Sequence, residues 1–142
     1  MKVDENVWNI MQKHLGYTDE EMKIFREDPK NEDILSKTPV LMDKTIVAEV
    51  VESHGCNSQH KKGDKFYLDG AGSIISKLSP KRMCIFPMAS LAPLVFGIHE
   101  LFYAGIDPNE MRFKRAGCLD VGVNCGGWGH IVMEVRVEDR KK

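Results

Sequence analysis

The sequence has almost no net charge and no long uninterrupted apolar segment. Its 142 residues carry 20 lysines and arginines against 21 aspartates and glutamates, a net charge of −1 at pH 7. Such a balance argues against the basic field that binds nucleic acids or anionic membranes. The longest apolar stretch, Met83 to Ile98, is interrupted by Pro87 and Pro93 and is shorter than the ~20 residues of a membrane span. The first residues lack the apolar core of a secretion signal. We therefore predict a cytoplasmic protein with neither nucleic acid nor a membrane as its partner.

Cysteine is also scarce, and several enzyme signatures are missing. The chain has four cysteines, Cys56, Cys84, Cys118 and Cys125, and no C-x-x-C, G-x-S-x-G or H-E-x-x-H motif. Four cysteines in a chain of this length do not suggest a secreted disulfide framework, so we expect reduced thiols. A reduced thiol can bind a metal, react, or lie buried as a small apolar side chain.

Glycine and charge divide the chain near residue 44. Residues 1–44 contain one of the twelve glycines, Gly16, and carry 10 acidic and 7 basic residues. Apolar residues at helical spacing before Gly16, and a capping box from Thr18 to Glu21, predict two short helices. Asn31 is expected to cap one last turn through Leu35. We interpret residues 1–44 as a helical arm and residues 45–142 as a second domain.

The arm has more apolar side chains than two short helices can bury against each other. Trp8, Ile10, Met11, Tyr17 and Phe25 all fall within it. We therefore expect the arm to pack on the rest of the chain, on a protein partner or on a second copy. This makes an accessory subunit one hypothesis for the function.

The second domain is predicted to be α+β. Alternating apolar residues predict strands at 45–52 and 130–137, and shorter strands at 65–68 and 111–115. Apolar residues spaced i, i+4, i+7 and i+11 predict a helix over 88–103, with Pro93 in its first turn or at a kink. The expected fold is a small antiparallel sheet or barrel with one central helix and the N-terminal helical arm.

Two loops carry the residues with chemical potential. In the first, Cys56 and His60 are close enough on one loop to reach the same cation, and thiolate and imidazole both bind zinc or iron. Lys61 and Lys62 beside them make a positive spot that could hold a small anionic ligand, or simply a solvated turn.

The second loop is rich in glycine. Residues 117–129 contain five glycines, among them Gly126 and Gly127, and such a segment is expected where the backbone approaches a ligand or another segment closely. Cys118 and Cys125 offer thiolates, and Asp120 offers a carboxylate. Trp128 is either a lid over a ligand or an apolar plug.

The order of these residues resembles that of a family of small prokaryotic proteins without an established activity, frequent in anaerobes. That family has a C-x(2-4)-G-H-K-x-G-D motif, a central cysteine and a late C-P-D motif before the last strand. The resemblance covers roughly residues 45–137. This chain differs in having Gln59 and Leu119 where glycine and proline are common, and in adding the arm and residues 125–129. The resemblance implies that Cys56, His60, Cys84 and Cys118 belong together, but it implies no reaction.

Two hypotheses for the site follow. The first is a metal site for zinc or iron, the latter alone or in an iron–sulfur cluster, with ligands Cys56, His60, Cys84 and Cys118 and with Cys125 as a spare. A protein of this kind could be an accessory subunit of an anaerobic enzyme system. The second is a small enzyme without a cofactor, in which Cys118 or Cys125 is the reactive thiol, Asp120 assists it, and Lys61 or Lys62 binds an anionic substrate.

Overall fold

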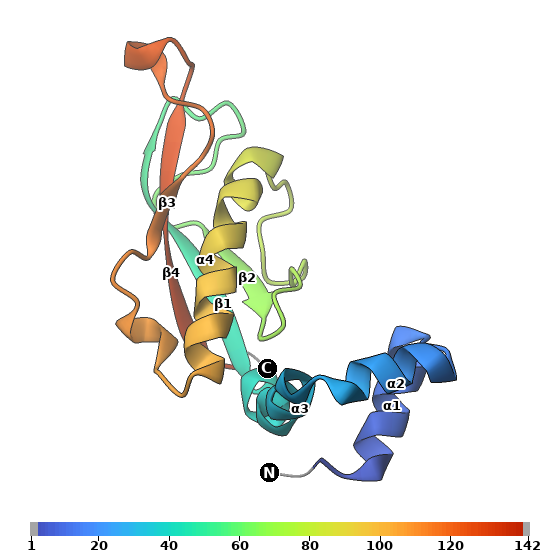
Figure 1. The fold of residues 1–142 in the computed structure, drawn as a ribbon. Coiled ribbons are helices and arrows are strands. Elements are labelled where there is room, and N and C mark those ends of the chain that lie inside the picture. Colours follow the sequence, from blue (N-terminus) through green and yellow to red (C-terminus); the bar gives the residue numbers. More distant parts are fainter. Residues whose placement is uncertain (1–2, 141–142) are drawn as a thin grey trace. The chain divides into compact units, whose positions relative to one another are not determined.

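The structure, a computed structural model, describes residues 3–140. The chain divides into two units, one ending at Leu41 and the other beginning at Met42 (Figure 1). Each unit has its own architecture and is described by itself.

The first unit consists of helices α1 (Glu5–Leu15), α2 (Asp19–Glu27) and α3 (Pro29–Met42), the last of which ends just past the unit boundary. Gly16 ends α1 in the left-handed conformation, and Thr18 and Glu21 form the predicted capping box, with bonds of 3.1 and 2.9 Å. Both of these predictions are confirmed. The single turn expected through Leu35 is wrong, because α3 runs for 14 residues and continues past Pro39.

The added length of α3 changes how the apolar residues of the arm are covered. Trp8, Met22 and Leu35 are buried together, and the ring of Trp8 packs edge-on against Phe25 with 6.1 Å between the centroids. Because α3 supplies Leu35 as a third wall, these side chains find cover inside the unit. Ile10, by contrast, stays 56% exposed, so the expectation that the arm is covered by something outside it stays a prediction. Assembly through residues 1–44 stays a prediction.

The second unit is an open four-stranded antiparallel sheet with one long helix, which confirms the α+β class. The strands are β1 (Lys44–His54), β2 (Lys65–Asp69), β3 (Arg115–Gly117) and β4 (His130–Asp139), in the order β2-β1-β4-β3. Helix α4 (Ile85–Tyr103) and the short 3₁₀ helices η1 (Pro108–Glu110) and η2 (Val123–Cys125) complete it. The strand predicted at 111–115 forms later, because Met111 follows η1 and packs against the core around α4.

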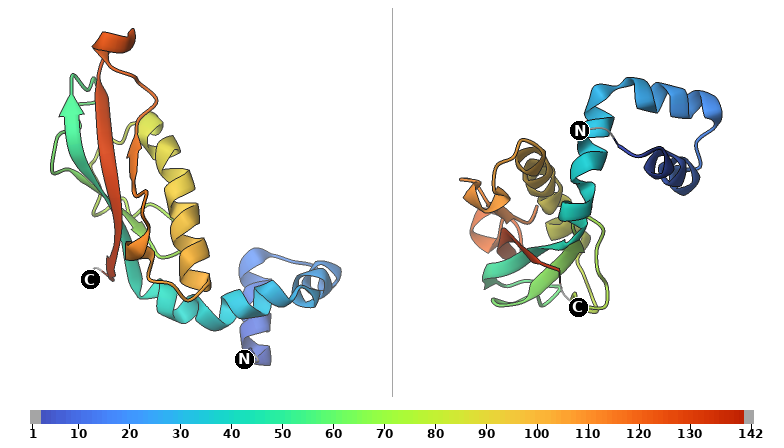
Figure 2. Two further views of the ribbon diagram at one scale, coloured as in Figure 1. Left: turned by 60° about the vertical axis from the view of Figure 1, so that its left-hand side comes forward. Right: turned by 90° about the horizontal axis from the view of Figure 1, so that it is seen from below.

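Helix α4 lies along one face of the sheet (Figure 2). Leu91, Val95 and Ile98, at the predicted spacing, are buried against β1 and β4 residues such as Val50 and Met133. The helix is 19 residues long and, by length and composition alone, apolar enough to cross a membrane. One face of the helix packs on the sheet and buries Leu91, Val95 and Ile98, while Ile85 and Phe96 are exposed.

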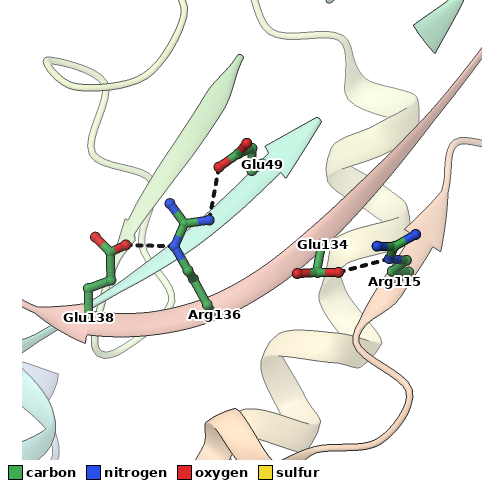
Figure 3. A network of polar contacts seen from close by, with 5 residues as sticks. All are labelled: Glu49, Arg115, Glu134, Arg136 and Glu138. Carbon is green, nitrogen blue, oxygen red and sulfur yellow. Dashed lines mark hydrogen bonds and ion pairs between the residues drawn. The ribbon is translucent and has the colours of Figure 1, made fainter. Parts of the chain in front are cut away.

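Charged side chains lie on the other face of the sheet (Figure 3). Arg136 on β4 binds Glu49 at 2.9 Å and Glu138 at 2.6 Å, and these hydrogen bonds raise its pKa. The Cα partner of Arg136 on β1 is Val47, which is fully buried. Partly exposed pairs of this kind each contribute only about 0–1 kcal/mol. This face is polar cover for the sheet, and the residues of interest lie elsewhere, at one end of the sheet.

Candidate functional site

Three chain segments meet at the end of the sheet where β1 finishes and β4 begins. They are the loop after β1, the start of α4 and the glycine-rich loop between β3 and β4, and they enclose a cavity of about 240 Å³. The side chains on its lining that can bind a metal or a proton are Cys56, His60, Cys84, Cys118, Asp120 and His130. Cys84 lies 24 residues after His60 and 34 residues before Cys118, so segments distant in sequence contribute to one cavity.

The cavity exists because two loops cross at glycines. A Cβ atom added to Gly129 would lie 2.0 Å from the carbonyl oxygen of Gly55 and 2.6 Å from the backbone nitrogen of Cys56. Only glycine permits such an approach between two backbones. The crossing brings Cys56 beside the glycine-rich loop, as the glycine count of residues 117–129 predicted for a close approach.

Asp120 holds the glycine-rich loop in shape. Its carboxylate accepts hydrogen bonds from the backbone N–H groups of Gly122 (2.9 Å), Trp128 (2.9 Å) and Gly129 (3.1 Å). These bonds, that of Gly122 foremost, hold the pKa of Asp120 below its ordinary value. Gly127 passes so close that an added Cβ would lie 2.2 Å from the carboxylate.

These contacts bear on the alternative in which Asp120 assists a reactive cysteine. A carboxylate with three N–H partners and a lowered pKa stays ionised at neutral pH, so it is a poor donor or acceptor of protons. The geometry gives Asp120 a loop-organising role. An acid–base role for it has no support here.

The sulfur of Cys118 contacts a backbone N–H group, an imidazole nitrogen and a carbonyl oxygen. The backbone N–H of Ile131 donates to it at 3.4 Å, and Nδ1 of His130 lies 3.6 Å away. Nδ1 of His130 also contacts the carbonyl oxygen of Asp120. Because a carbonyl can only accept, Nδ1 carries the proton in this arrangement. The thiol of Cys118 also donates to the carbonyl oxygen of Asp120 at 3.7 Å, so the N–H group of Ile131 is the donor that a thiolate at this position would keep, as thiolate ligands do in metal sites.

His60 is buried, with 4% of its surface exposed, and its ring packs edge-on against Phe66. Its Nε2 accepts a hydrogen bond of 3.1 Å from the backbone N–H of Cys84, the residue that caps α4. Burial lowers the pKa of His60, opposed by the nearby Asp64. A neutral ring that accepts at Nε2 carries its proton on Nδ1, so neither nitrogen is free for a metal in this arrangement. His60 instead positions Cys84 and the start of α4.

The structure brings some of the predicted site residues together and leaves others apart. Cys56, His60, Cys84, Cys118 and Trp128 line the cavity. Residues predicted for the site but outside this lining are Lys61, Lys62, Cys125, Gly126 and Gly127. Within residues 3–140, no three cysteine, histidine or acidic side chains are arranged around a single cation position. The thiols thus share a cavity without converging on one point.

Sequence reasoning did not single out His130. It was treated only as the first residue of the last strand, because nothing in its spacing from Cys118 marks it as a partner. The one signal available was its place directly after a loop that contains two cysteines and five glycines. Because β3 and β4 are paired, a histidine at the end of this loop lies close to the residues at its beginning.

No protein-family model, curated protein or solved structure matches the chain significantly. The resemblance to the prokaryotic family with the C-x(2-4)-G-H-K-x-G-D motif therefore stays a prediction.

Proposed function

We propose that this protein binds a soft metal ion, zinc or iron, through the thiolates of Cys56, Cys84 and Cys118. The observation that carries the proposal is that three of the four cysteines line one cavity, although they are 28 and 34 residues apart in the chain. They come from a loop, a helix cap and the loop after β3. Cysteines that serve only as small core residues need not line the same cavity.

The surroundings of the sulfur atoms suit thiolate ligands. Cys84 lies at the N-terminus of a 19-residue helix, where the helix dipole favours negative charge. The sulfur of Cys118 accepts an N–H bond from Ile131, an outer-shell contact of the kind that orients metal ligands. Cys56 and Cys118 lie on loops, so small loop movements could draw the three sulfurs to the ~2.3 Å that zinc requires.

The ligand set differs from the one expected from sequence. His60 acts through the N–H group of Cys84, and Cys125 is exposed and outside the cavity lining. Three thiolates leave a fourth position for an exogenous ligand, as in zinc sites that keep an open position. Iron, alone or in a cluster, is the alternative metal, because thiolates bind both. Reduced thiols fit a cytoplasmic location, and an accessory role in an anaerobic enzyme system is the wider setting we propose.

Metal analysis tests the proposal directly. The full chain is purified without oxygen, its metal content is measured, and the metal-free form is titrated with Co²⁺. We expect one metal ion per chain and a thiolate-to-cobalt charge-transfer band. Replacing Cys56, Cys84 or Cys118 with serine should weaken binding by at least about tenfold and shrink the band.

Cys125 offers a matched control, since Cys125→Ser changes the same atoms at an exposed site outside the lining. That variant should bind Co²⁺ like the wild type. If all four serine variants bind equally, or none of the proteins binds metal, the proposed function is wrong.

The Cys118–His130 pair favours a second candidate, a thiol enzyme without a metal. The 3.6 Å contact is close to the geometry in which an imidazole stabilises a reactive thiolate. In that case the metal-free protein should react with iodoacetamide at Cys118 faster than at Cys56 or Cys84, and His130→Ala should slow the reaction. Equal labelling of the three cysteines would count against this candidate.

A further inference from the structure

The cavity is larger than a metal site requires. Its volume is about 240 Å³, whereas an apolar cavity of about 150 Å³ already holds a molecule of benzene. One cation held by three sulfur atoms would fill only part of this space. The remainder is too small for a drug-sized compound, whose pockets begin at about 300 Å³. The volume therefore fits a small organic molecule beside the thiols.

The charge of the lining argues for an uncharged molecule. Among the described residues, no lysine or arginine side chain lines the cavity, and Lys61 and Lys62 of the adjoining loop lie outside it. The carboxylate of Asp120 already accepts three hydrogen bonds from backbone N–H groups. An anion would find no lysine or arginine partner here, and a charged ligand of either sign would lose its hydration against the apolar walls.

The walls supply apolar contact area. Phe86 and Trp128 line the cavity, yet 53% and 73% of their surfaces are exposed, which places them toward its mouth. Pro87 and Ile131 are buried and line it as well. Aromatic rings that remain exposed beside a cavity offer flat apolar surface to a ligand. Ligand pockets characteristically combine such walls with a few polar groups.

We infer that the cavity binds a small, uncharged, mainly apolar molecule of about the size of benzene, in contact with Phe86 and Trp128 and next to the cysteines. The inference deepens the proposed function by naming the class of ligand at the same site. The position of the ligand beside a metal rests on the proposed function, whereas its affinity comes from the apolar walls of the cavity.

The two tryptophans allow a test on the full chain. Trp8 lies in the core of the first unit and Trp128 in the cavity lining, so fluorine NMR of protein labelled with fluorotryptophan gives a site probe and an internal reference. The Trp128→Phe variant assigns the two resonances. Toluene, benzoate and benzylammonium are titrated into the metal-free and Co²⁺-loaded forms. We expect toluene to shift the Trp128 resonance saturably and leave that of Trp8 unmoved. In the metal-free form the two charged analogues should bind at least about tenfold more weakly, because each would lose its hydration in the apolar cavity.

Phe86 and Phe96 provide matched variants on the same helix. Both rings are exposed, but Phe96, at 68%, lies outside the cavity lining. Phe86→Ala should weaken toluene binding about tenfold, and Phe96→Ala should leave it unchanged. An unshifted Trp128 resonance, equal binding of benzoate, or equal loss in the two alanine variants would overturn the inference.

The two proposals can fail separately in this experiment. If cobalt binds and toluene does not, the metal site stands and the apolar ligand is wrong. If toluene binds and cobalt does not, the proposed metal function is wrong, and the cavity is a binding site for apolar molecules alone.

Discussion

The two tryptophans show how differently the two units use similar residues. In the first unit, 3% of Trp8 is exposed, and its ring packs on Phe25 among the three helices. In the second, 73% of Trp128 is exposed on a loop of glycines, while a histidine, His60, is 96% buried nearby. In the first unit the tryptophan is part of the core. In the second unit the tryptophan is exposed at a cavity whose lining also contains a buried histidine.

The contrast shows that features that cost stability occur around the cavity of the second unit. Burying a neutral histidine and exposing an indole both cost stability relative to the reverse. Glycines that allow a backbone crossing weaken a fold as well. Such costs are tolerated where a site needs them, and here they gather around Cys56, Cys84 and Cys118. The following predictions test the contrast, from the largest expected effect to the smallest.

Trp8 and Trp128 should respond in opposite ways to replacement with alanine. Trp8→Ala removes the largest side chain of a small core, and we expect the free energy of unfolding of the first unit to fall by about 3–5 kcal/mol. Trp128→Ala removes an exposed ring and should change stability by no more than about 0.5 kcal/mol while it weakens ligand binding. Urea unfolding of both variants measures the difference. Comparable losses of stability would erase the distinction between the two units.

The glycines of the second loop should separate into two kinds. Gly129→Ala forces a Cβ against the backbone of Gly55, and we expect a loss of roughly 3 kcal/mol together with the loss of metal binding. Gly126 has an open surrounding but a φ of 89°, so Gly126→Ala should cost only about 1–2 kcal/mol and spare binding. Thermal unfolding and Co²⁺ titration of both variants test this. Equal behaviour would show that the crossing is not what shapes the site.

Sequence reasoning predicted the local features of the first unit better than the site in the second. Helix ends are governed by neighbours in the chain, so Gly16 and the Thr18 capping box were predictable. The grouping of Cys56, Cys84 and Cys118 in one cavity depends on where the sheet places three distant segments, and the sequence could only suggest it. The partners of His60 and His130 were beyond reach, because each is a backbone group of a residue distant in the chain. Lys61 and Lys62 were predicted from their clustering in the chain, which does not show which way a loop faces.

His60 should act on the site through Cys84. His60→Ala leaves the backbone N–H of Cys84, the N-cap residue of α4, without its partner, and we expect a loss of about 1–3 kcal/mol together with weaker metal binding. His60→Gln retains a side-chain acceptor and should recover part of both. Urea unfolding and Co²⁺ titration compare the two. Equal loss in both variants would mean that the ring acts by filling space, and that its hydrogen bond does not matter.

Asp120 should give the glycine-rich loop a dependence on pH. The folded protein holds the pKa of Asp120 below its ordinary value, so the stabilisation is present above about pH 4 and is lost as the pH falls through the lowered value. The protection factors of the Trp128 and Gly129 amides, which are exchange rates measured against the intrinsic rate at each pH, should therefore fall on acidification of the metal-free protein. In Asp120→Asn these protection factors should be low throughout and nearly insensitive to this change. Asp28→Asn, which removes a carboxylate of lowered pKa in the first unit, is the control and should leave the loop unaffected.

The smallest expected effect concerns the positive spot formed by Lys61 and Lys62. Both side chains are exposed and outside the cavity lining, although their loop also carries Cys56 and His60. Replacing both with alanine should change the free energy of unfolding by no more than about 0.5 kcal/mol, because neither side chain is buried. Co²⁺ and toluene should bind the double variant as they bind the wild type, since a neutral ligand in an apolar cavity gains little from exposed charges screened by water. A marked fall in affinity for either probe would instead show that these lysines belong to the site, and it would restore the anionic ligand first suggested by the sequence.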